Sequence, residues 1–239
     1  MANGNLYIVA TPIGNLNDIT LRAIEVLKQV DLIAAEDTRH SRKLLDAYAI
    51  ETRLTSVHDH NEADRADYLC GLLAQGQDIA LISDAGTPLI SDPGFRLVRA
   101  VREAGFEVVT IPGPCAAVAA LSVAGLPTDR FLFVGFLPAK QQARRTTLET
   151  LHGESATLVF YESPKRIVET LQDMALVFGG EREAAIAKEL TKAFETVKTA
   201  TLEALLVWLQ EDEHRQRGEF VVLVKGREAL SGEILIDAK

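Results

Sequence analysis

Seven short and continuous apolar runs constrain this 239-residue chain more than any other feature of its sequence. They lie at residues 6–10, 32–35, 79–82, 108–111, 131–134, 158–161 and 220–224. Runs this short, rich in β-branched residues, predict strands that are buried on both faces. Amphipathic segments such as 19–30, 66–73 and 95–104 lie between them and predict helices. Strands that alternate with helices indicate an α/β fold with mostly parallel pairing.

The turn sequence Gly125–Asp129 predicts a junction between two domains. We expect an N-terminal α/β domain over residues 1–126, with a mostly parallel sheet, and a C-terminal α/β domain over 127–239. In the second half, strands are expected near 131–135, 155–161, 184–189, 194–200 and 219–225, and helices near 141–151, 164–178 and 201–213.

Composition narrows the class of protein. The formal net charge of −9, from 25 basic and 34 acidic residues, argues against a sequence-independent polyanion binder but allows a local basic patch. Two cysteines, Cys70 and Cys115, make no disulfide framework, which fits a reducing cytoplasm.

The first ten residues have no basic n-region, so a signal peptide is not expected. Residues 108–128 carry no charge, but their prolines predict a buried strand, a turn and a buried helix instead of a membrane span.

Small Gly- and Pro-rich turns follow three of the predicted strands. They are Thr11–Asn15, Ser83–Pro88 and Pro112–Ala116. In open parallel sheets, ligands bind at the carboxyl ends of the strands. One such loop would be explained by the ordinary shortness of α/β connections. Three in the first 116 residues predict a small-molecule site.

Several common catalytic signatures are missing from the sequence. It contains no G-x-G-x-x-G, no G-x-S-x-G and no H-E-x-x-H. Gly71 and Gly76 have P-loop spacing, but Gln77 replaces the lysine. His58 and His60 are one residue apart, which is compatible with a shared metal, with acid–base chemistry, or with a polar loop in which Asp59 or Asn61 caps a helix.

Consecutive polar residues follow the strand 32–35. The segment Glu36–His40 lies at the carboxyl edge expected to bind ligands. Thr38 is a candidate cap for a helix over residues 41–47, but capping by Thr38 leaves the Glu36–Asp37 pair unexplained. We therefore favour a functional role for that pair.

Basic residues recur in two further segments. Arg96, Arg99 and Arg102 share one helix face, which we interpret as solvated. Residues 138–148 contain Lys140, Arg144 and Arg145 and no acid, so they predict either a local patch that contacts phosphates or an ordinary surface helix.

Five segments together resemble the RsmI family, the bacterial 16S rRNA cytidine ribose 2′-O-methyltransferases within the tetrapyrrole methylase superfamily. The resemblance runs from about Leu6 to about Lys225 and is specific in combination. The segments are Leu6–Leu16 with Asp18–Thr20, Ala35–His40, Val57–Glu62, Ser83–Pro88 and Pro112–Ala116.

The resemblance implies a two-domain fold, a homodimer and S-adenosylmethionine in a cleft between the domains. The family's cofactor-binding positions correspond here to Pro12, Ile13, Gly14, Ser83, Asp84, Ala85, Gly86, Thr87, Cys115, Ala116, Tyr161 and Leu190. Ser83 stands where the superfamily usually has glycine. The resemblance also implies an RNA partner, 16S rRNA within the 30S subunit.

The residues that assist the ribose hydroxyl should lie at the same sheet edge as the cofactor loops. Candidates are Glu36, Asp37 and His60, with His60 as a base whose ordinary pKa is close to neutrality. Candidates for RNA phosphates are Arg39, Arg42 and Lys43, and also Lys140, Arg144 and Arg145. No metal is required for this reaction.

Two rival functions remain at this point. One is C-methylation of a tetrapyrrole in cobalamin or sirohaem synthesis. The other is a non-catalytic module that binds S-adenosylmethionine and occupies RNA.

Overall fold

The computed structural model describes residues 2–58 and 62–227, and the chain divides into two compact units, Met1–Cys115 and Ala116–Lys239. The turn Gly125–Asp129 lies inside the second unit, after the helix α5 (Ala116–Val123). This helix contacts strands of the second unit, which is why the division precedes it.

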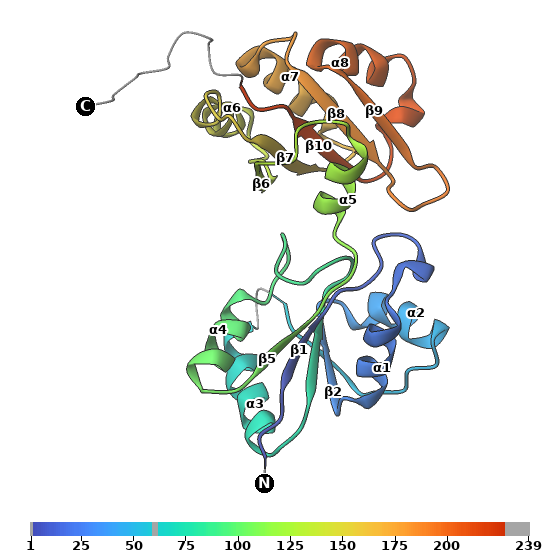
Figure 1. The fold of residues 1–239 in the computed structure, drawn as a ribbon, viewed down its shortest axis with the longest axis vertical. Helices are drawn as coiled ribbons and strands as arrows, with labels where there is room; N and C mark the ends of the chain where they lie inside the picture. The colour runs from blue at the N-terminus through green and yellow to red at the C-terminus, as the bar shows by residue number, and fades with distance from the viewer. Residues whose placement is uncertain (1, 59–61, 228–239) are drawn as a thin grey trace, which may run out of the picture. The chain divides into compact units, whose positions relative to one another are not determined.

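The first unit is a parallel sheet with helices on both faces (Figure 1). The sheet order is β3-β2-β4-β1-β5. Its strands are β1 (Leu6–Val9), β2 (Leu32–Ala35), β3 (Leu54–Ser56), β4 (Ile79–Ile82) and β5 (Val108–Ile111). Its helices are η1 (Leu16–Asp18), α1 (Leu21–Gln29), α2 (Thr38–Ala47), α3 (Glu62–Ala74) and α4 (Phe95–Glu103).

Alternate residues of these strands belong to two different cores. Val9, Ile33 and Ile82 pack with side chains of α1 and α2. Their neighbours Leu32 and Leu81 pack with side chains of α3 and α4 on the opposite face. Because both faces are covered by helices, the strands are apolar at almost every position, as the sequence predicted.

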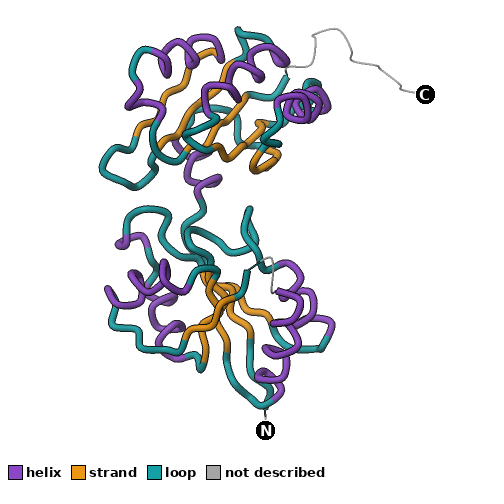
Figure 2. The backbone as a smooth tube through the Cα atoms, turned by 180° about the vertical axis from the view of Figure 1, so that it is seen from behind, coloured by secondary structure: helices purple, strands orange, loops and turns teal. Residues whose placement is uncertain are grey.

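The connections of this sheet change direction at β4. The chain leaves β1 and β2 for α1 and α2 on one face, whereas it leaves β4, which lies between them, for α4 on the other face (Figures 1 and 2). The chain after β4 therefore runs to the opposite face of the sheet from the chain after β1 and after β2. This is the position at which α/β sheets form ligand-binding crevices.

The second unit has a mixed sheet with the order β6-β7-β10-β8-β9, in which β6 and β7 are parallel and the other pairs antiparallel. Its core packs α6, α7 and α8 on one face, while α5 contacts β7 and β10. Its strands are β6 (Phe131–Phe136), β7 (Thr157–Glu162), β8 (Glu183–Lys188), β9 (Thr196–Thr201) and β10 (Phe220–Val224). Its helices, besides α5, are α6 (Gln141–Thr150), α7 (Ile167–Phe178), α8 (Leu202–Gln210) and η2 (Glu213–Gln216).

The predicted fold class is confirmed, with a parallel first sheet and a mixed second one. Each of the seven apolar runs forms a strand. Differences are confined to element ends and to the two short helices η1 and η2, which are too brief to carry a periodic signal.

The predicted basic patch at Lys140, Arg144 and Arg145 requires correction. Arg144 is 0% exposed, and its Nε lies 2.7 Å from Oδ2 of Asp173, itself 0% exposed. Arg145 donates through Nε to the other oxygen of Asp173 at 2.6 Å. Arg144 is therefore not available to an RNA phosphate, and Arg145 is already paired. The acid that neutralises them lies on α7, 28 or more residues away in sequence.

This buried ion group joins α6 to α7. Burial acts to raise the pKa of Asp173, but the hydrogen bonds from Arg145 and Arg144 hold it below its ordinary value. The carboxylate thus stays ionised and keeps both helices in register.

We predict that Asp173→Ala lowers the free energy of unfolding by about 3–5 kcal/mol, because it leaves the Arg144 guanidinium buried without its partner. Urea unfolding followed by circular dichroism measures the change. The matched control is Glu169→Ala, which removes an exposed carboxylate 3.6 Å from Arg144 and should cost about 0–1 kcal/mol. Equal losses for the two variants would contradict this assignment.

Candidate functional site

Three loops of the first unit are joined at the carboxyl ends of neighbouring strands. Thr11 and Gly86 exchange two backbone hydrogen bonds, with N···O distances of 2.8 and 3.0 Å. The hydroxyl of Thr87 donates to the carbonyl of Pro114 at 2.9 Å. The loops after β1, β4 and β5 thus form one framework. They are the three small turns for which the sequence predicts a small-molecule site.

Gly86 shows why that framework needs a glycine. Its φ of +84° lies in the left-handed region. A Cβ at this position would lie 3.3 Å from Cγ2 of Ile13 and 3.8 Å from the carbonyl oxygen of Pro114. A residue with a side chain would therefore be strained at this position and crowded against Ile13, which is why the junction of the three loops carries a glycine.

A fourth loop, after β2, is tied to the loop after β4. The backbone N–H of Asp37 donates to Oδ1 of Asp84 at 3.1 Å. The segments Glu36–His40 and Ser83–Thr87, which are 47 residues apart, therefore meet at one edge. This juxtaposition is the one the sequence predicted for substrate and cofactor residues.

Asp37 is the N-cap of α2. Its carboxylate accepts from the N–H groups of Arg39 at 2.8 Å and of His40 at 3.4 Å. The candidate cap Thr38 is instead the first residue of the helix, so that alternative is wrong. The backbone hydrogen bonds of Arg39 and His40 lower the pKa of Asp37 below its ordinary value, which makes Asp37 a weak proton acceptor.

Asp92 is a member of this edge that the sequence reasoning missed. Burial raises its pKa to about 6, the negative charges of Glu36 and Asp84 act in the same direction, and a hydrogen bond from Ser83 opposes them. The dipeptide Ser91-Asp92, which repeats Ser83-Asp84 and precedes a Pro-Gly turn, was a signal that could have identified it. The edge therefore concentrates negative charge from three carboxyl groups.

The backbone that carries Asp92 is strained. Leu89 has a φ of 74° and Ser91 a φ of 65°, and neither is a glycine. Such conformations persist only where the surrounding structure enforces them, and they are common in binding loops.

The remaining predicted cofactor positions are placed as follows. Pro12, buried Ile13 and Gly14 follow β1, Cys115 ends the first unit, and Ala116 opens α5. In the second unit, the hydroxyl of Tyr161 accepts from the N–H of Ala117 at 3.1 Å. Leu190 is buried just after β8.

Of the predicted histidines, His60 lies outside the described residues. His58 is partly buried just after β3. Among the residues that the structure describes, no three His, Cys, Asp or Glu side chains are grouped so as to hold a metal ion.

The first predicted RNA patch is exposed. Arg39, Arg42 and Lys43 all lie on the solvent side of α2, the helix that begins at Asp37. Lys140 is also exposed, at the N-cap of α6.

The fold and the joined loops match a known class of enzyme. The family model for tetrapyrrole (corrin/porphyrin) methylases matches residues 5–206. Two solved structures share the fold. Uroporphyrin-III-C-methyltransferase from Thermus thermophilus superposes with a TM-score of 0.65 at 22% identity, over 93% of this chain and 94% of that chain. Diphthine synthase superposes with a TM-score of 0.70 at 16% identity, over 95% of this chain and 92% of that chain.

Closer relatives define the branch. The ribosomal RNA small subunit methyltransferase I of Escherichia coli O157:H7 is 54% identical over 237 residues, which cover 99% of this chain and 83% of the relative. The Vibrio cholerae protein of the same name is 57% identical over 221 residues, 92% of this chain and 77% of the relative. This chain belongs to the ribosomal RNA small subunit methyltransferase I family, within the tetrapyrrole methylases. The resemblance seen in the sequence is confirmed.

A search of the described residues for a helix both long and apolar enough to cross a bilayer finds none.

We predict that Asp92→Asn stabilises the protein at pH 8 by about 1–2 kcal/mol and has almost no effect near pH 4. A raised folded-state pKa means that the carboxyl stays neutral at low pH without cost, and that its charge disfavours the folded state once the pH passes about 6. The two-unit shift would correspond to about 2.7 kcal/mol, which we reduce because the side chain is only partly buried.

Thermal unfolding at the two pH values measures this difference. Asp129→Asn, which removes an exposed carboxylate from a turn of the second unit, is the matched control. An equal gain for Asp92→Asn at both pH values would show that the charge of Asp92 is not the cause.

Proposed function

We propose that this chain transfers a methyl group from S-adenosylmethionine to a ribose 2′-oxygen of a cytidine in 16S rRNA. The observation that carries the proposal is identity of 54–57% with relatives named ribosomal RNA small subunit methyltransferase I, over nearly the whole chain. The joined loops at the carboxyl edge of the first sheet provide a site of the right kind for it.

The residues at this edge suit S-adenosylmethionine. When bound, this cofactor supplies an electrophilic methyl group on a sulfonium, together with an ammonium, a carboxylate and ribose hydroxyls. Asp84 is placed to hold a cation or a hydroxyl, and the charges of Glu36 and Asp92 reinforce its negative potential. We propose that the small residues of these loops let the carboxylate of the cofactor approach backbone N–H groups closely.

Tyr161 and Leu190 are proposed to face the adenosine. Tyr161 suits a fixed contact because the rings of Phe133 and Phe136 pack edge-on against it, with centroids 5.0 and 5.7 Å away. Its hydroxyl is further held by the N–H of Ala117.

Glu36 is our proposed partner of the substrate hydroxyl. It follows β2 directly, and its negative charge contributes to the raised pKa of Asp92 at the same edge. A carboxylate there holds the hydroxyl in line and accepts its proton as the oxygen attacks, help that is typically worth about 10²–10⁴-fold in rate. Asp37 is proposed to act indirectly, by fixing the start of α2 and by its backbone hydrogen bond to Asp84. His60 stays a candidate base.

RNA phosphates are proposed to contact Arg39, Arg42 and Lys43. These exposed cations extend along α2 from the edge that carries Glu36, so a strand whose ribose lies at Glu36 has its neighbouring phosphates within their reach. Lys140 remains a second, isolated candidate.

Two parts of the proposal rest on the family alone. These are a homodimer and a cytoplasmic location, where ribosomal subunits assemble. Tetrapyrrole C-methylation is not favoured, since the related C-methyltransferase shares only 22% identity and supports the fold alone.

The proposed function is tested by incubating the protein with 30S subunits and radiolabelled S-adenosylmethionine, then mapping the modified nucleotide. We expect one methylated cytidine ribose in 16S rRNA and no transfer to a porphyrinogen. Transfer to the porphyrinogen instead, or binding of the cofactor without any transfer, would support the two rival functions.

Two single variants separate cofactor binding from catalysis. We expect Asp84→Ala to weaken S-adenosylmethionine binding in calorimetry at least about tenfold, as loss of a charge-assisted hydrogen bond implies. Glu36→Gln should keep that affinity and lose about 10²-fold or more in single-turnover rate on 30S subunits. Unchanged affinity in the first, or an unchanged rate in the second, removes that residue from its proposed role.

A further inference from the structure

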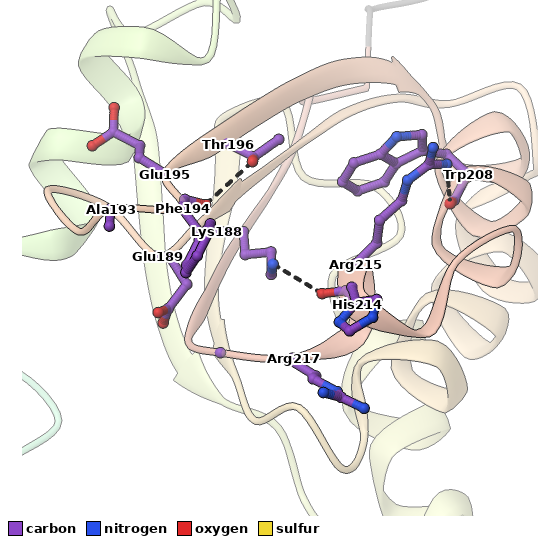
Figure 3. A pocket seen from close by; sticks show the side chains of 11 residues that line it. Lys188, Glu189, Ala193, Phe194, Glu195, Thr196, Trp208, His214, Arg215 and Arg217 are labelled. Carbon is purple, nitrogen blue, oxygen red and sulfur yellow. Dashed lines mark hydrogen bonds between the residues drawn. The ribbon is translucent and has the colours of Figure 1, made fainter.

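A cavity of about 810 Å³ opens in the second unit at the end of β8. Its wall combines residues from β8, the following loop, α8 and η2 (Figure 3). None of these residues was predicted to form a site, and none belongs to the loops at the edge of the first sheet.

Lys188 is a buried cation in this wall. Its side chain is 8% exposed, and its Nζ donates to the backbone carbonyl of His214 at 3.0 Å (Figure 3). Within the described residues, no carboxylate forms an ion pair with this ammonium. A buried ammonium is costly unless an anion compensates it, and a carbonyl oxygen carries only a partial charge.

The charged residues that line the wall are the cations Lys188, Arg215 and Arg217 and the acids Glu189 and Glu195, an excess of one positive charge. Arg217 is exposed and has no ion pair among the described residues. Glu189 accepts from Lys192 Nζ at 2.9 Å and also interacts electrostatically with Lys188. Glu195 accepts only from the neutral N–H of Thr191, and Arg215 is paired with Glu211 at 2.7 Å. Burial acts to raise the pKa of Glu189, but the Lys192 contact holds it below its ordinary value. This surplus is notable in a chain of net charge −9.

Aromatic rings accompany these cations. Phe194 is 77% exposed, which is unusual for so large an apolar side chain. Trp208 is fixed by Arg215, whose guanidinium lies 5.1 Å from the centre of the indole ring and donates to the Trp208 carbonyl (Figure 3). An aromatic surface beside cations is the arrangement by which proteins stack unpaired bases and hold the adjoining phosphates.

The loop that carries Phe194 is held in a strained conformation. Glu189 has a φ of 51° and the β-branched Thr191 a φ of 65°. Strain of this kind needs a compensating role for the loop.

We propose that this cavity binds an unpaired nucleotide of the RNA substrate, with its base against Phe194 and Trp208 and its phosphate at Arg217 and Lys188. The inference rests on the proposed function, because it takes the substrate to be RNA. It assigns RNA contacts to residues other than the candidates Lys140, Arg144 and Arg145. Arg144 and Arg145 are instead paired with Asp173.

Trp208 makes the test direct because it is the single tryptophan of the chain. Hexacytidylate is titrated into the full protein while intrinsic fluorescence is recorded, and inorganic phosphate is titrated in parallel. We expect saturable quenching by the oligonucleotide that weakens as salt rises, with little effect of phosphate. Arg217→Gln should lower the slope of log affinity against log salt by about 0.7. Phe194→Ala should weaken binding at least about fivefold.

Arg102→Gln is the matched control, because it neutralises an exposed arginine on α4 of the first unit. Both tested side chains are exposed, so their variants should keep the wild-type melting temperature. In the 30S assay, Arg217→Gln and Phe194→Ala should raise KM for the subunit and leave kcat unchanged.

The outcomes distinguish this proposal from the proposed function. The cavity proposal alone would be overturned by two results together: the wild type and both variants methylate 30S subunits with equal KM, and hexacytidylate does not quench the fluorescence. Quenching by phosphate as strong as by hexacytidylate would reduce the cavity to an anion site and also overturn it. If hexacytidylate quenches the fluorescence and both variants weaken this effect, but the protein methylates no 30S subunit, the proposed function is overturned and the RNA-binding cavity stands.

Discussion

The parallel pairing of β4 between β1 and β2 is the constraint on which the candidate site depends. It brings the loops after four strands to one edge, and it sends the chain after β4 to the opposite face from its neighbours. Three contacts then join the loops: the paired backbone groups of Thr11 and Gly86, the hydrogen bond from the Thr87 hydroxyl to the Pro114 carbonyl, and the hydrogen bond from the Asp37 N–H to Asp84. Burial raises the pKa of Asp92 at this edge, and repulsion by the carboxylates of Glu36 and Asp84 adds to that effect.

This repulsion has a functional meaning for a methyltransferase. A site that holds excess negative charge before its ligand arrives is destabilised, and a cationic ligand relieves that cost on binding. If the proposed function holds, S-adenosylmethionine, with its sulfonium and ammonium, is a ligand that would relieve this cost. The exposed cations of α2, which we propose as RNA contacts, belong to the helix that begins at the same edge.

In the second unit, two buried cations differ in the partner that each one meets. Arg144 and Lys188 are both buried, yet Arg144 meets the carboxylate of Asp173 whereas the hydrogen bond of Lys188 goes to a backbone carbonyl. The first arrangement is complete within the fold and stabilises it. The second leaves positive charge at the wall of a cavity, which is why we assign it a ligand.

The sequence by itself determined the fold class, because strands buried on both faces must be apolar at every position and helices with one buried face must be periodic. It also placed Glu36–His40 and Ser83–Thr87 at one edge, since the carboxyl ends of parallel strands coincide. It could not determine which polar residue caps α2, because Asp37 and Thr38 are both competent caps. Nor could it show that Asp173 neutralises Arg144, or that Arg217 joins Lys188 across 29 residues, since charge pairing over such separations depends on how helices and strands pack. The tertiary structure alone decided which cations are paired inside the protein and which stay exposed, because burial and pairing depend on how the helices and strands pack.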